Sequence, residues 1–98
     1  MGYQVHIPPT ERAYLDNLPL SDVARERVED FITYAIADVD DATRNDPANR
    51  PQPGPPYFQR QLLLLDIWGD GRVHTIDVVV NDAAAAYGVL VFVYVDHR

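Results

Sequence analysis

The sequence predicts a single α+β domain in which a short strand and two helices precede three antiparallel strands, in the order β-α-α-β-β-β. The last third of the chain alternates apolar and polar residues in three runs, which is typical of strands. Residues 21–39 repeat apolar side chains every three or four positions, which is typical of a helix that packs on a sheet. The length of 98 residues allows one hydrophobic core, so residues 1–98 should form one domain.

The N-terminal half is expected to hold one strand and both helices. Residues 3–7 alternate and end at two prolines, which predicts a short strand. Thr10 should cap a short helix that ends before Pro19, and Ser21 should cap the long helix. This long helix should fray or end between residues 38 and 43, because aspartates there meet the negative end of the helix dipole. Its apolar stripe should face the sheet and consists of Val28, Phe31, Ile32, Ala35 and Ile36.

Residues 45–56 are expected to form an exposed Pro-rich loop. Five prolines in this segment remove backbone donors and restrict φ, which argues against a helix or a paired strand. Such a segment is either functional or an extended connector, and the composition favours a connector.

Three strands should follow this loop. The first covers residues 57–68 and the second 72–81, with a hairpin turn at 69–71 whose glycines allow positive φ. The third covers residues 87–95, and apolar side chains on both of its faces predict a central strand. One of those faces should hold Val89, Val91, Val93 and Val95, and the other Leu90, Phe92 and Tyr94. The polar residues 96–98 should then lie at the rim of the sheet.

The composition restricts partners and compartment. All eight basic residues are arginines, and fifteen acids give a net charge of −7, so free nucleic acid is not an expected partner. Arginine without lysine is also what a GC-rich genome favours. The chain has no cysteine, which excludes disulfides. No apolar stretch approaches the roughly 20 residues of a membrane span, and the N-terminus lacks the features of a signal peptide, so we expect a cytoplasmic protein without a membrane partner.

The order of elements, the length and several short motifs resemble the RelE/ParE superfamily of bacterial toxin–antitoxin systems. Gly-Arg-Val at 71–73 follows the hairpin, and Val-Asp-His-Arg at 95–98 is similar to the family's closing Val-Gly-His-Arg. Residues 3–7 resemble the family's first strand, and Leu-Pro-Leu at 18–20 resembles the turn between its helices. The resemblance covers nearly the whole chain and implies a RelE/ParE-like fold with two helices across an antiparallel sheet.

The resemblance also implies candidate catalytic residues. Ribonuclease members of the family cut messenger RNA on the ribosome, with basic side chains at the scissile phosphate and a Tyr or His as general acid. Here the matching residues are Arg72 and Arg98 for the phosphate and His97 for proton donation. A guanidinium can bind two phosphate oxygens, and an imidazole titrates near neutral pH. No cofactor and no metal are implied.

The sequence departs from the ribonuclease pattern in the strand before the hairpin. Those members carry lysines there, whereas positions 62–65 are leucines and the chain contains no lysine. The chain also ends at Arg98, without the C-terminal extension that supplies the acid in many members. Because the loss of one catalytic group typically costs about 10²–10⁴ in rate, we do not expect efficient cleavage. Members of the ParE type poison DNA gyrase by protein contact and do not need these groups.

We therefore expect a toxin-like protein of a type II toxin–antitoxin pair that acts mainly by protein binding. Its partners would be an antitoxin protein and a target such as the ribosome or DNA gyrase. One alternative is a ribosome-dependent messenger endoribonuclease that uses Arg72, His97 and Arg98. A second alternative is a non-toxic interaction domain that retains the fold and forms a homodimer.

Charged residues of the predicted sheet should neutralise one another. Asp96, and Asp66 or Asp77, should pair with the candidate arginines, because fifteen acids face eight bases. Arg60 and Asp66 share one strand face and are expected to pair with Asp96 or Arg72.

The sequence predicts structural roles for the histidines, without a catalytic pair or a metal site. His74 and Asp77 should point to opposite faces of one strand, which argues against a catalytic pair, and we expect His74 to be half-exposed. His6, His74 and His97 have no spacing typical of metal ligands, so no metal site is predicted.

Overall fold

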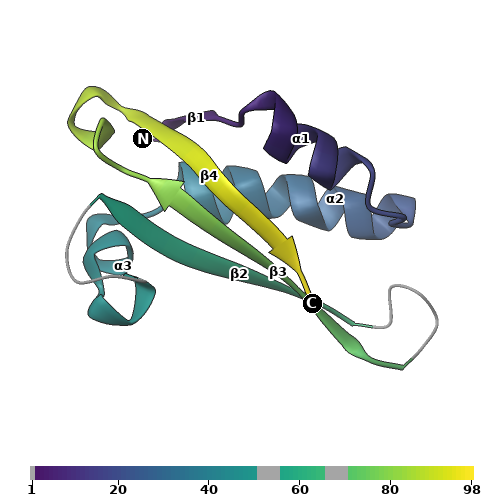
Figure 1. The fold of residues 1–98 in the computed structure, drawn as a ribbon. Coiled ribbons are helices and arrows are strands. Elements are labelled where there is room, and N and C mark those ends of the chain that lie inside the picture. Colours follow the sequence, from purple (N-terminus) through teal and green to yellow (C-terminus); the bar gives the residue numbers. More distant parts are fainter. Residues whose placement is uncertain (1, 51–55, 66–70) are drawn as a thin grey trace.

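The computed structural model describes residues 2–50, 56–65 and 71–98 and forms an α+β domain. A four-stranded mixed sheet carries helices α1 and α2 over one face, while α3 lies beside the first part of β2 (Figure 1). The elements are β1 (Gln4–His6), α1 (Pro9–Asp16), α2 (Asp22–Asp30), η1 (Phe31–Ala37), α3 (Asp41–Asn45), η2 (Pro47–Asn49), β2 (Tyr57–Leu65), β3 (Val73–Asn81), η3 (Ala85–Tyr87) and β4 (Val89–His97). In the described part of the chain, no helix has the length and apolar character needed to cross a membrane.

The strands lie in the order β1-β4-β3-β2. β2 pairs antiparallel with β3, and β3 pairs antiparallel with β4. β1 joins the other side of β4 in parallel, so β4 is a central strand, as its two apolar faces predicted. β1 and β2 are therefore the two edges of the sheet.

A β-bulge in β4 changes which side chains face the helices. The register shifts between Val79 and Val80 of β3, which leaves Val93 as an extra residue in β4. Strict alternation predicted Val95 and Phe92 on opposite faces, but both are buried in the same core. That prediction was wrong because alternation does not continue through a bulge. Tyr94 and Val95 are therefore each on the opposite side of the sheet from the one predicted.

The structure confirms one of the two predicted helix caps. Ser21 caps α2, since its hydroxyl oxygen accepts a hydrogen bond from the Ala24 N–H at 3.2 Å. The cap predicted at Thr10 was wrong, because α1 already begins at Pro9 and has no side-chain cap. Proline fits the first turn of a helix, where its missing N–H would have no partner.

The long helix continues from α2 into η1, a π-helical segment. Its apolar stripe faces the sheet as predicted, with Val28, Phe31 and Ile36 buried and Ile32 and Ala35 packed against the same core. This helix ends at Ala37.

The aspartates that follow the long helix begin a new one. Asp40 caps α3, and its carboxylate accepts a hydrogen bond from the Thr43 N–H at 2.6 Å. That hydrogen bond is the main cause of a lowered pKa of Asp40. Acidic groups stabilise the N-terminus of a helix, so the sequence here favours a second start over a frayed end.

The Pro-rich segment 45–56 is partly helical. Asn45 ends α3, and Pro47 opens the single 3₁₀ turn η2, whose N-cap Asp46 accepts a hydrogen bond from the Ala48 N–H. The expectation that prolines exclude any helix was wrong here, because the first position of a turn needs no donor. Residues 45–48 are exposed as predicted, but Asn49, Arg50 and Pro56 are partly buried. The prediction was wrong for Arg50, whose side chain is 8% exposed because it binds Asp82. Residues 51–55 of this loop, and 66–70 of the predicted strand and hairpin turn, lie outside the described residues.

Candidate functional site

The C-terminal residue Arg98 extends the ladder between β3 and β4. Its N–H donates to the Thr75 carbonyl at 2.8 Å, and the Thr75 N–H donates to the Arg98 carbonyl at 2.7 Å. The preceding residue, His97, lies opposite Ile76, which is buried under the helices. Successive side chains of a strand alternate, so His97 faces the helix side and Arg98 faces the open side of the sheet. Two of the three candidate residues are therefore on opposite faces.

On the open face, Arg98 binds Asp77. Its Nε donates to Asp77 Oδ2 at 2.8 Å, and its Nη2 lies 2.8 Å from the same oxygen. The Asp77 side chain is 8% exposed and the Arg98 side chain 61% exposed. The register also places Asp96 directly opposite Asp77. An acid thus neutralises this arginine, as the excess of acidic residues predicted.

On the helix side, His97 meets His74. The Nε2 of His97 lies 3.2 Å from the Nδ1 of His74, and the rings stack with centroids 5.3 Å apart. One of these nitrogens donates and the other accepts, depending on the tautomer. His74 is buried, so the prediction of a half-exposed histidine was wrong, because it lies opposite Leu64 in the core-facing row of β3. Sequence reasoning missed this pair, since only the bulge turns His97 toward His74.

Arg72 precedes β3 and lies in an arm formed by the ends of β2 and β3, which extends past the end of β4 (Figure 1). Thr75 is the β3 residue paired with Arg98, so Arg72 lies three positions farther out along this arm. Arg72 is exposed. Among the residues placed by the structure, no group of three or more His, Asp or Glu side chains could hold a metal ion.

The open face of the arm carries exposed apolar side chains. Leu65 pairs with Val73, and Leu63 lies two residues before Leu65 on the same face of β2. Their exposed fractions are 57% for Leu63, 69% for Leu65 and 57% for Val73. We call these three residues the apolar strip.

A buried cluster of charges lies at the other end of the sheet. The Asp82 carboxylate accepts hydrogen bonds from Arg44 Nη1 at 2.7 Å and from Arg50 Nη1 and Nη2 at 3.1 and 3.0 Å. Burial alone would raise the pKa of Asp82, but the hydrogen bonds from Arg50 and Arg44 outweigh it and lower that pKa. The cluster ties α3 and η2 to the end of β3. This cluster has a structural role. Its members lie far apart along the chain, so no local sequence pattern indicates that they meet.

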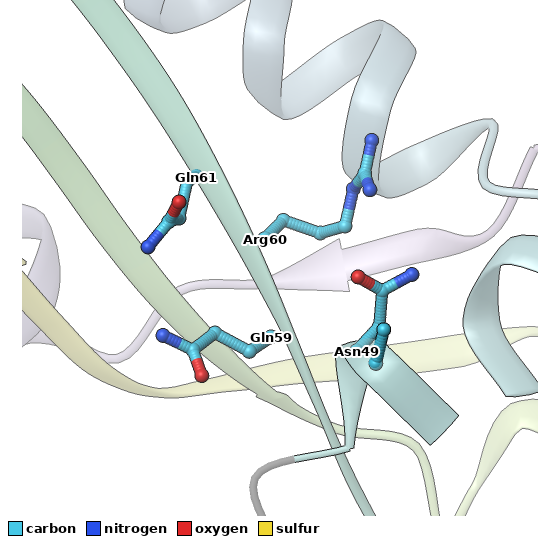
Figure 2. A pocket seen from close by; sticks show the side chains of 5 residues that line it. Asn49, Gln59, Arg60 and Gln61 are labelled. Atoms are coloured by element: carbon cyan, nitrogen blue, oxygen red, sulfur yellow. The ribbon is translucent and has the colours of Figure 1, made fainter. Parts of the chain in front are cut away.

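A cavity of about 350 Å³ lies beside β2 and is lined by Ala48, Asn49, Gln59, Arg60 and Gln61 (Figure 2). Arg60 was expected to pair with Asp96, and that prediction was wrong. β3 separates β2 from β4, and Arg60 lies opposite Val78 in the helix-facing row, whereas Asp96 points to the open side. Asp66 lies outside the described residues.

No protein-family model, curated protein or solved structure matches this chain.

Proposed function

We propose that this chain is a toxin-like protein of a type II toxin–antitoxin pair and acts by binding another protein. The apolar strip is the observation that carries this proposal. Three large aliphatic side chains, each more than half exposed, lie together on the open face of the arm. Contiguous apolar surface of this kind marks protein contacts, because its burial in a complex is favourable.

The charges near Arg98 support contact with a protein over cleavage of RNA. A scissile phosphate would need the N–H groups of Arg98 that already bind Asp77. The carboxylates of Asp77 and Asp96 would also repel a phosphate at this place. His97 lies on the other face, so it does not join Arg98 in one patch facing a substrate.

The arrangement of elements supports a RelE/ParE-like fold. Two helices cover one face of the sheet, and the three later strands follow one another as an antiparallel meander (Figure 1). In this proposal, an antitoxin covers the apolar strip in the resting pair. The free protein then uses the strip to reach a target such as DNA gyrase or the ribosome.

Induced expression in bacterial cells tests the proposal. Wild type should arrest growth, and the double variant Leu65→Ser/Val73→Thr should not, because it removes most of the apolar strip. Val23→Ser is the matched control, since Val23 is 71% exposed but lies on α2, and it should still arrest growth. Circular dichroism of each purified variant would verify that it is folded.

A programmed-ribosome assay separates the two alternatives. Messenger RNA should remain intact with wild type. Robust cleavage that both Arg72→Ala and Arg98→Ala abolish would establish the endoribonuclease instead. Folded wild type that neither arrests growth nor cleaves messenger, and that sediments as a dimer, would point to the non-toxic homodimeric domain.

A further inference from the structure

β2 is an edge strand, and its ladder shows which backbone groups face outward. The Asp82 N–H donates to the Pro56 carbonyl at 2.7 Å, so residues 56 and 82 form a hydrogen-bonded pair. Hydrogen-bonded pairs alternate along an antiparallel ladder, so the even-numbered residues of β2 bond to β3. The odd-numbered residues direct their N–H and C=O groups away from the sheet; they are Tyr57, Gln59, Gln61, Leu63 and Leu65.

Arginines reach two of these outward carbonyls. Arg50 donates to the Tyr57 carbonyl at 2.9 Å, and the Nη2 of Arg27 lies 3.5 Å from the Leu63 carbonyl. Both contacts agree with the alternation derived from the ladder. Within the described ranges, no hydrogen bond reaches the outward backbone groups of Gln59 and Gln61, which lie between these two contacts. The middle of the edge can therefore accept another strand.

Arg60 lies at the centre of this open stretch. Its Nε is buried and has no hydrogen-bond partner among the described residues, and its guanidinium makes no ion pair there. The charge of Arg60 contributes only the smallest part of the lowered pKa of Asp40, after the hydrogen bond from Thr43. A half-buried guanidinium without an acceptor is unfavourable, and a carboxylate from a partner would satisfy it.

Arg60 and the edge residues Gln59 and Gln61 line the same cavity. Figure 2 shows Arg60 and Asn49 on one side of β2, and Gln59 and Gln61 on the other. A segment that runs along this edge can pair with the backbone of both glutamines. One of its side chains then enters the cavity beside Arg60.

We propose that the free edge of β2 binds an extended acidic segment of a partner protein, which adds a strand to the sheet and places a carboxylate against Arg60. This inference rests on the proposed function, since it assumes a protein partner. Charge complementarity supports the acidic segment, because Arg27 and Arg60 lie along this edge in a chain whose net charge is −7. A second copy of β2 would not supply the carboxylate, since residues 57–65 contain no acid.

Selection of random nine-residue peptides displayed on phage, with the whole chain as bait, tests this site. The enriched peptides should carry Asp or Glu at one fixed position, flanked by residues that favour strands. The strongest peptide, synthesised with a fluorophore, gives the dissociation constant by anisotropy. Both Arg60→Gln in the protein and the acid-to-amide change in the peptide should weaken binding about tenfold or more. The two changes together should weaken it no further than one alone. Arg12→Gln, which removes an arginine from α1, should leave binding unchanged.

A second pair of variants tests strand addition itself. Gln61→Pro removes an outward N–H and no bond of the β2–β3 ladder, so it should abolish peptide binding while the protein stays folded. Gln61→Thr keeps that N–H and should bind normally. The amides of Gln59 and Gln61 should exchange slowly with solvent deuterium only when peptide is bound.

Enrichment without a fixed acidic position, no enrichment at all, or binding that survives Arg60→Gln or Gln61→Pro in folded protein would overturn the inference. If the proposed toxin function is wrong but the edge site is real, the experiments give a different result. A protein that binds acidic peptide at β2 but never arrests growth retains the edge site and loses the toxin role.

Discussion

Asp82→Ala is expected to lower the free energy of unfolding by about 3–5 kcal/mol, because it leaves the guanidinium groups of Arg50, which is buried, and Arg44, which is partly buried, without their shared carboxylate. The Asp82 side chain is 2% exposed, and that of Arg50 is 8% exposed. Urea denaturation at pH 7 measures the change. The control is Asp16→Ala, which removes a half-exposed acid paired with Arg12 and should cost less than about 1 kcal/mol.

The pH dependence gives an independent check on Asp82. Because its pKa is lowered in the folded protein, its carboxylate stabilises the fold at pH values above the unfolded-state pKa, about 3.9. That stabilisation is lost as the pH falls through the lower, folded pKa. The difference in stability between wild type and Asp82→Ala should therefore shrink as the pH falls from 5 to about 2. A difference that stays constant over this range would show that the charge of Asp82 is not its source.

Phe31→Ala is expected to destabilise the protein by about 3–5 kcal/mol, through lost burial and the cavity that remains. Phe31 is 8% exposed and lies at the start of η1, where the stripe of the long helix meets the sheet. Val23→Ala, on the exposed side of α2, should change stability by no more than about 0.5 kcal/mol. A denaturation midpoint that Phe31→Ala leaves unchanged would show that this side chain is outside the core.

The helices and most strand positions followed from local patterns. The stripe from Val28 to Ile36 faces the sheet because helical periodicity acts over a few neighbouring residues, all visible in the sequence. Ser21 was recognisable as a cap for the same reason. The apolar faces of β4 likewise identified a central strand. The sequence did not predict that α3 begins after Asp40 or that Pro47 opens a 3₁₀ turn, because the same residues are common both in loops and in the first turn of a helix.

The surroundings of the candidate residues depend on register between strands. The extra residue Val93 turns His97 toward His74 and Arg98 toward Asp77. Nothing local marks this bulge, because it requires no glycine and depends on how β4 fits against β3.

Contacts across long stretches of chain were also invisible in the sequence. Asp82 meets Arg44 and Arg50 only after η2 and the end of β3 come together. Arg60 faces an open edge because β3, not β2, takes the place beside β4. Sequence by itself determined the α+β class, the helix stripe and the central strand, since each depends on local periodicity. Only the tertiary structure decided which charges meet and which edge stays open, since these depend on pairing between distant segments.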